Sequence, residues 1–169
     1  MDMESRRQFI TVVAVTLGLA PVVAWLGRPT AGRSLMNDAQ FPLQKTDEQW
    51  RQELSPQEYE VLRQHGTERA FTSQLNDEKR DGTFVCAACE QPLFTSDTKY
   101  ESGTGWPSFW RPIEGAVGTT TDSSLFMTRI EVHCSNCGGH LGHVFPDGPA
   151  PTGQRYCMNG VAMRFVPAP

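Results

Sequence analysis

The sequence has no excess of positive charge, because 15 lysines and arginines face 19 aspartates and glutamates and leave a net charge of −4. This balance excludes a nucleic-acid binder that works by neutralising phosphates. The sequence also has no internal repeat longer than a pair of cysteines. Hydrophobic residues make up 38% of its 169 residues, which rules out disorder, collagen or coiled coil as a description of the whole chain. Length and composition predict one domain of ordinary size plus a short additional segment.

The number of cysteines is odd. The chain has five, so they cannot all pair in intramolecular disulfides. At least one cysteine therefore needs another explanation.

Charged residues are absent from the apolar run 8–27, which follows two adjacent arginines. The string Ser5-Arg6-Arg7-Gln8-Phe9-Ile10 resembles the twin-arginine export signal of bacteria. The alternative is an ordinary N-terminal membrane anchor, since the run is about long enough to span a bilayer. We expect residues 1–31 to be a signal peptide or an uncleaved anchor, residues 32–45 a linker, and residues 46–169 the functional domain. In either case that domain faces the exterior of the inner membrane, in the periplasm.

Two capping-box patterns predict two short helices at the start of the domain. The first begins at Thr46 with Gln49 three residues later, and the second begins at Ser55 with Glu58 in the same relation. After Gly66 the helical signals stop, and short apolar segments alternate with Gly, Pro, Asn and Asp. Such segments are typical of antiparallel β structure, so we expect a mainly β domain behind two short helices. The segments are residues 83–85, 125–127, 130–132 and 163–166.

Four of the cysteines form two Cys-x-x-Cys pairs, Cys86 with Cys89 and Cys134 with Cys137, separated by 44 residues. Two such pairs suit a tetrahedral site of four thiolates that binds Zn²⁺. Four protein ligands leave no open position, so we predict one structural zinc ion. Two disulfides are the alternative in an exported protein, and a thiol-disulfide oxidoreductase that uses the pairs is a further one.

The fifth cysteine, Cys157, lies between Arg155 and Asn159. In a strand these three residues would share one face, and a cation beside a thiol favours the reactive thiolate. The alternative is a small buried hydrophobic residue. Two histidines, His140 and His143, follow the second cysteine pair closely, and with four cysteines present they are not needed as metal ligands. The loop 102–110 offers Trp106 as an aromatic wall, for which core packing is the alternative.

Several longer motifs accompany these residues in a fixed order. Together with the cysteine pairs they closely resemble the B-type methionine sulfoxide reductases, which reduce the R epimer of methionine sulfoxide. The resemblance runs from about Trp50 to Phe165. The motifs are GTERAF at 66–71, FTSDTKY at 94–100, GWPSF at 105–109, HLGHVFPDGP at 140–149 and RYCMN at 155–159.

The resemblance implies a role for each candidate residue. Cys157 corresponds to the nucleophile that attacks the sulfoxide sulfur and becomes a sulfenic acid. Trp106 corresponds to the residue whose indole receives the substrate methyl group. The polar residues that hold the sulfoxide oxygen and deliver protons to it correspond to His140, His143 and Asn159. A cation near the nucleophile corresponds to Arg155, and the four paired cysteines to zinc ligands that only some family members retain.

The resemblance also implies the fold and the partners. The fold is a pair of antiparallel sheets with short N-terminal helices, and the substrates are oxidised proteins or peptides that carry methionine-R-sulfoxide. Many family members have a resolving cysteine where this chain has Thr104. We therefore expect an external thiol reductant, such as a thioredoxin- or glutaredoxin-like protein, to reduce Cys157. We expect the enzyme to be a monomer that binds no nucleic acid. A zinc-stabilised binding module of the same fold without catalysis is the competing hypothesis.

Overall fold

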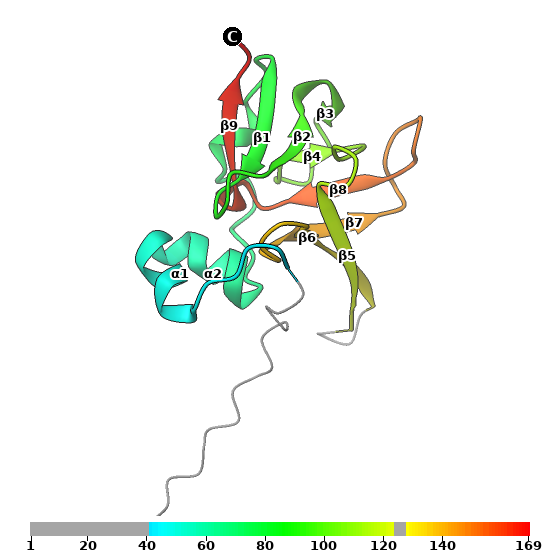
Figure 1. Ribbon diagram of the computed structural model, residues 1–169. Coiled ribbons are helices and arrows are strands. Elements are labelled where there is room, and N and C mark those ends of the chain that lie inside the picture. The colour runs from blue at the N-terminus through cyan, green and yellow to red at the C-terminus, as the bar shows by residue number, and fades with distance from the viewer. Residues whose placement is uncertain (1–40, 124–127) are drawn as a thin grey trace, which may run out of the picture. The chain divides into compact units, whose positions relative to one another are not determined.

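The computed structural model describes residues 41–123 and 128–169, which begin with two short helices (Figure 1). Helix α1 spans Asp47–Glu53 and helix α2 spans Pro56–Gln64. Both begin with the predicted capping box, in which Thr46 or Ser55 accepts a backbone N–H through its hydroxyl. Helices this short are marginal in water on their own. Burial of their apolar side chains stabilises them, above all Trp50, Tyr59, Val61 and Leu62.

Three antiparallel strands form the smaller sheet, in the order β2-β1-β9. The central strand β1 (Gly82–Cys86) pairs with β2 (Pro92–Thr95) on one side and with β9 (Met163–Pro167) on the other. The last strand of the chain therefore lies beside the first, as the red and green ribbons of Figure 1 show. The turn between β1 and β2 holds the first cysteine pair.

The larger sheet has six antiparallel strands, in the order β3-β4-β8-β7-β6-β5. Strands β8 and β7 are its centre, and they bring together segments that the sequence analysis considered separately. The turn between β6 and β7 holds the second cysteine pair. The strands are β3 (Lys99–Tyr100), β4 (Ser108–Phe109), β5 (Val117–Asp122), β6 (Arg129–Cys134), β7 (His140–Phe145) and β8 (Arg155–Met158).

The core lies between the two sheets and is built on aromatic rings. Phe84 of β1 and Phe94 of β2 pack against Phe109 of β4, with ring centroids 4.9 Å and 4.3 Å away. All three side chains are fully buried, and burial of each contributes about 2 kcal/mol. Tyr156 of β8 approaches Phe94 from the same side. One face of the large sheet thus faces the core, and the residues between these core positions point to the other face.

The structure confirms the predicted mainly β fold with two antiparallel sheets and two short helices. Beyond Gln64 the only helices among the described residues are 3₁₀ helices of three residues each. The expected strands at residues 83–85, 130–132 and 163–166 are present. The predicted strand at 125–127 and the predicted signal at 1–31 lie outside the described residues. No helix within residues 41–123 and 128–169 is both long and apolar enough to cross a membrane.

The last residues of the predicted linker contact the domain. Phe41 packs edge-on against His133, with ring centroids 5.4 Å apart. The backbone N–H of Leu43 donates to the carbonyl of Asn136, in the turn that carries the second cysteine pair. These contacts hold residues 41–43 beside that turn.

Candidate active site and metal centre

One row of paired residues crosses the large sheet and contains most of the predicted chemistry. In this row Tyr100 pairs with Ser108, Ser108 with Cys157, Cys157 with His143, and His143 with Glu131. Directly paired residues of antiparallel strands project to the same face. Cys157 therefore lies between a serine and a histidine on its two neighbouring strands. The adjacent row, which includes Phe109 and Tyr156, faces the core.

An irregularity in β7 brings His140 to the same face as His143. Residues three apart in a regular strand point to opposite faces. Here Val132 pairs with Gly142 and His133 with His140, so Leu141 is an extra residue in a β-bulge. The rings of His140 and His143 consequently lie with centroids 5.4 Å apart. The structure thus brings together the two histidines that the sequence analysis grouped with Cys157.

Gly142 follows the bulge and lets β7 approach β8 closely. A Cβ atom at this position would lie 2.2 Å from the carbonyl oxygen of Cys157 and 3.0 Å from the Cα of Met158. Both neighbours are backbone atoms that cannot turn away as a side chain would. The motif therefore needs glycine between its histidines to keep His143 beside the nucleophile.

His140 is buried and bound to a carboxylate. Its Nδ1 lies 2.7 Å from Oε1 of Glu131, and Nδ1 of His65 lies 3.0 Å from the same oxygen. Burial alone would raise the pKa of Glu131, but the hydrogen bonds from the two histidines outweigh it and lower the pKa to about 2. Glu131 is therefore ionised at neutral pH.

His143 has a carboxylate partner of its own. Its Nε2 lies 3.0 Å from Oδ2 of Asp122, and the same oxygen accepts a hydrogen bond from Arg129 at 2.7 Å. Burial lowers the pKa of His143, and the hydrogen bond to Asp122 opposes that effect without cancelling it. The neutral ring donates Nε2–H to Asp122, which leaves Nδ1 as its acceptor atom.

Cys157 is partly exposed and lies next to Thr104, with Oγ1 of Thr104 3.7 Å from Sγ of Cys157. Arg155 lies two residues earlier in β8 and forms two hydrogen bonds of 2.9 Å with Asp147. Its guanidinium also covers the ring of Phe145 at 4.5 Å. Arg155 is thus held rigidly by a bidentate ion pair beside the strand that carries the nucleophile.

Trp106 and Asn159 meet through the backbone of Glu68. The indole N–H of Trp106 donates to the Glu68 carbonyl at 3.1 Å, and the Glu68 N–H donates to Oδ1 of Asn159 at 3.0 Å. Asn159 also donates to the carbonyl of Leu141 at 3.1 Å. It follows the end of β8 and is 3% exposed. Its amide is therefore engaged on both sides by protein groups, close to both Trp106 and β7.

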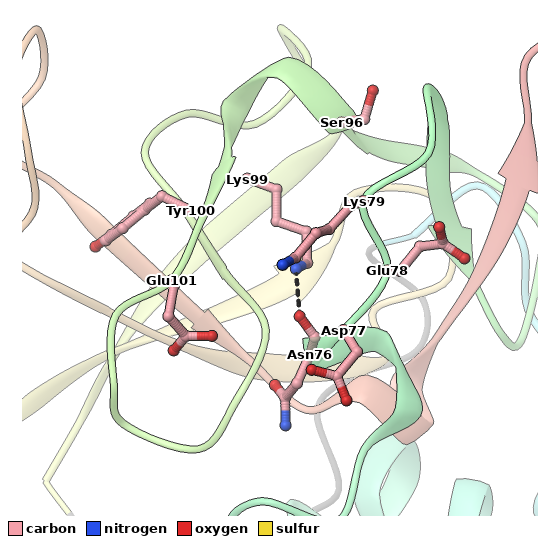
Figure 2. A pocket seen from close by; sticks show the side chains of 8 residues that line it. All are labelled: Asn76, Asp77, Glu78, Lys79, Ser96, Lys99, Tyr100 and Glu101. Atoms are coloured by element: carbon pink, nitrogen blue, oxygen red, sulfur yellow. Dashed lines mark hydrogen bonds between the residues drawn. The ribbon is translucent and has the colours of Figure 1, made fainter.

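Tyr100, at the end of the polar row, forms part of the wall of a pocket (Figure 2). Lys99 reaches into this pocket and donates to the carbonyl of Asn76 at 2.8 Å, whereas the Tyr100 hydroxyl is turned away from Lys99. Burial raises the pKa of Tyr100, and the positive charge of Arg155 lowers it by a smaller amount. None of the predicted site residues lines this pocket, so the candidate active site lies on the sheet face outside it. The pocket is lined by Asn76, Asp77, Glu78, Lys79, Ser96, Lys99, Tyr100 and Glu101.

The four paired cysteines converge on one point between the two sheets. Their sulfur atoms all lie within 4.8 Å of one another. Sγ of Cys86 is 3.8 Å from that of Cys137, and Sγ of Cys89 is 3.6 Å from that of Cys134. Tetrahedral zinc with Zn–S bonds of 2.3 Å requires sulfur separations of about 3.8 Å. These residues therefore fit a zinc ion.

Sequence reasoning missed four polar residues of this face: Glu131, His65, Asp122 and Glu68. Glu131 and Asp122 bind the predicted histidines through their carboxylates, and His65 binds Glu131. Glu68 binds Trp106 and Asn159 through its backbone. Glu68 lies within a motif that carried the family resemblance, but nothing in its spacing showed which residues it contacts. Only the strand pairing and the return of α2 bring these residues to the site.

Comparisons with known proteins find relatives over most of the chain. A protein-family model described as "SelR domain" matches residues 54–167. The chain is 53% identical over 134 residues to "Peptide methionine sulfoxide reductase MsrB" of Agrobacterium fabrum. This match covers 78% of this chain and 99% of that protein. Proteins of the same name from Leptospira interrogans and Methanosarcina barkeri are 56% and 57% identical. Those matches cover 74% and 75% of this chain and 96% and 90% of the relatives.

Proposed function

This chain belongs to the SelR family of B-type methionine sulfoxide reductases, and we propose that it reduces methionine-R-sulfoxide in proteins or peptides by means of Cys157. The observation that carries the proposal is the polar row in which Cys157 lies between Ser108 and His143. Cys157 is also the one cysteine outside the four-sulfur cluster. A partly exposed sulfur on the strand beside His143, whose ring adjoins that of the buried His140, suits nucleophilic attack that needs a proton donor.

In the reaction, the thiolate of Cys157 attacks the sulfur of the sulfoxide. This attack forms a bond between Sγ and the substrate sulfur. The oxygen then moves to Sγ, so that a bond between Sγ and oxygen forms while the sulfur–sulfur bond and the sulfur–oxygen bond of the substrate break. The substrate sulfur gains the two electrons that the cysteine sulfur loses, and the transferred oxygen takes up one proton. The products are methionine and the sulfenic acid of Cys157.

His140 and His143 supply the polar contacts to the sulfoxide oxygen. Oxygen is a poor leaving group until it is protonated, so an imidazole ring that carries a proton on the nitrogen facing the oxygen lowers the barrier. Trp106 offers its indole to the substrate methyl group, and its N–H bond to Glu68 fixes the ring. Arg155 and Asn159 hold the two ends of the segment that carries the nucleophile.

The four cysteines hold one structural zinc ion. When bound, zinc supplies a crosslink between the turns β1–β2 and β6–β7, with no open position for chemistry. The close approach of Cys86 to Cys137 and of Cys89 to Cys134 supports this assignment. It argues against a thiol-disulfide oxidoreductase that works through separate Cys-x-x-Cys pairs.

Residues 1–31 are a twin-arginine signal peptide or an uncleaved anchor, and the domain works in the periplasm. The motif around Arg6 and Arg7 and the uncharged run after it support this location. Folded export agrees with a zinc site that is loaded in the reducing cytoplasm.

A peptide that contains methionine sulfoxide of known configuration tests the function. With dithiothreitol as reductant, we expect the purified protein to reduce the R epimer and to leave the S epimer unchanged, measured by chromatography of the peptide. Stoichiometric zinc with no turnover of either epimer would instead support the binding module without catalysis.

Recycling of the enzyme depends on an external reductant, because Thr104 lies where a resolving cysteine would be needed. We expect the protein to stop after one equivalent of substrate as a sulfenic acid, which dimedone traps and which intact-mass analysis detects as a gain of one oxygen. Turnover should then rise with the concentration of an added thiol, because each cycle needs a bimolecular attack on the oxidised sulfur.

The variant Thr104→Cys tests the same prediction from the other side. Oγ1 of Thr104 lies 3.7 Å from Sγ of Cys157, so a shift of about 1.6 Å would bring a new thiol to the length of a disulfide bond. After one turnover this variant should lose two hydrogens. Ser102→Cys is the matched control, because the Ser102 hydroxyl contacts Thr104 and Ser108 rather than Cys157. A loss of two hydrogens in the wild type would mean that a cysteine of the cluster resolves the intermediate.

A further inference from the structure

Two histidines from distant parts of the chain share one oxygen of a buried carboxylate. Oε1 of Glu131 lies 2.7 Å from Nδ1 of His140 and 3.0 Å from Nδ1 of His65. His140 begins β7, Glu131 lies on the neighbouring β6, and His65 ends helix α2. The three residues therefore join the catalytic face of the sheet to the helices.

The geometry fits hydrogen bonds better than a metal ion. Two ligands of a tetrahedral zinc at 2.0–2.1 Å would be about 3.3 Å apart, whereas Nδ1 of His140 and Oε1 of Glu131 are 2.7 Å apart. That separation is normal for a charge-assisted hydrogen bond to a carboxylate. Each imidazole accordingly carries a proton on Nδ1 and donates it to Oε1.

This arrangement fixes which atom of His140 remains available. His140 is 2% exposed, and its Nε2 is buried without a hydrogen-bond partner among the described residues. A buried polar atom without a partner destabilises the fold, so it marks a place where a ligand atom is expected. Because Glu131 occupies Nδ1, Nε2 is the atom left to meet the substrate.

His65 explains why Glu131 stays in place. Its backbone adopts the left-handed conformation with φ of 57°, which ends α2 and turns the side chain back toward β6. Its ring lies beside that of His140 with centroids 5.2 Å apart. With its side chain 40% exposed, His65 closes the solvent side of a pair whose side chains are 2% and 6% exposed.

We propose that Glu131 and His65 are positioning residues for His140. Glu131 holds the ring through Nδ1–H and stabilises the doubly protonated ring, so that Nε2–H donates to the sulfoxide oxygen, and His65 holds Glu131 from helix α2. The inference rests on the proposed function for the identity of the substrate. It goes beyond it by naming the atom of His140 that contacts the oxygen and the two residues that place this atom.

Kinetics of Glu131→Gln and of two His65 variants test the proposal on a methionine-R-sulfoxide peptide with dithiothreitol. Glu131→Gln should lower kcat by about 10- to 100-fold, the effect of removing a partner that orients a functional histidine, while KM stays nearly unchanged. His65→Ala should lower kcat in the same direction. His65→Gln should restore most of that loss, because its amide N–H can still donate to Glu131. The exposed Glu114→Gln is the matched control and should keep wild-type kcat.

The imidazole tautomer gives a readout that does not depend on activity. In ¹⁵N NMR of the full chain with zinc bound, His140 should carry its proton on Nδ1 in the wild type, and Glu131→Gln should weaken that preference. A folded Glu131→Gln with wild-type kcat overturns the proposal, as does a wild-type His140 protonated on Nε2 with a bare Nδ1. If Glu131→Gln does not fold, equal kcat for His65→Ala and the wild type overturns it. If the wild type reduces no sulfoxide, the proposed function fails, and the tautomer still decides whether Glu131 holds Nδ1.

Discussion

Replacing Cys157 by serine is expected to abolish sulfoxide reduction and to leave the fold and the zinc content intact. A serine hydroxyl is a far weaker nucleophile than a thiolate, and it cannot form the sulfenic acid that the reaction requires. A loss of about 10⁴-fold or more in kcat is the size expected for removal of an essential nucleophile. The measurement is turnover of a methionine-R-sulfoxide peptide with dithiothreitol.

The surroundings of Cys157 indicate that the serine substitution leaves the fold and the zinc site undisturbed. Within residues 41–123 and 128–169, Sγ has one side-chain neighbour at hydrogen-bond distance, Thr104 at 3.7 Å, and it lies on the sheet face away from the aromatic core. Zinc content and melting temperature should therefore match the wild type, and both serve as controls. Activity that persists in a folded Cys157→Ser protein would contradict the assignment of the nucleophile.

Local sequence rules predicted the elements well where local chemistry decides them. Thr46 and Ser55 begin helices because each can cap its own first turn with a residue three positions later. The apolar segments around Phe84 and Val132 became strands because their side chains fill one face of a sheet. These features depend on neighbours within a few residues, so the sequence alone contains them.

The rule that residues two apart in a strand share one face holds for part of the site and fails for the rest. It applies to Arg155 and Cys157, which both lie in β8, but Asn159 follows the strand and its side chain binds backbone groups of Glu68 and Leu141. It would also separate His140 from His143, which the bulge at Leu141 brings together. A bulge depends on how two strands pair, and no spacing within one strand reveals it.

The partners of the histidines could not be predicted for a related reason. Glu131 lies nine residues before His140, and His65 lies in a different element altogether. Asp122 meets His143 only because β5, β6 and β7 are adjacent in the sheet. A buried carboxylate that orients a histidine is a property of tertiary structure, and the sequence shows only that suitable residue types are present.

Loss of one zinc ligand should unfold the domain, because the cluster joins the two sheets at the ends of β1 and β6. Cys134→Ser is expected to bind no stoichiometric zinc and to be largely unfolded at 25 °C. The free energy of binding a structural zinc is about 10–16 kcal/mol, which is as large as the whole stability of a typical domain, about 5–15 kcal/mol. Metal analysis and circular dichroism of the purified variant measure both effects.

The close contacts between the two cysteine pairs explain why a single ligand matters so much. Cys134 is fully buried and faces Cys89 across the cluster, while Arg63 of α2 donates to the carbonyl of Cys137 at 3.0 Å. The helices and both sheets thus depend on the same small turn.

Ser135→Ala is the matched control, because Ser135 lies in that turn but bonds only to the carbonyl of Ala116. It should lose about 1 kcal/mol and keep its zinc. A Cys134→Ser protein that is free of metal yet melts like the parent would show that the cluster does not stabilise the fold.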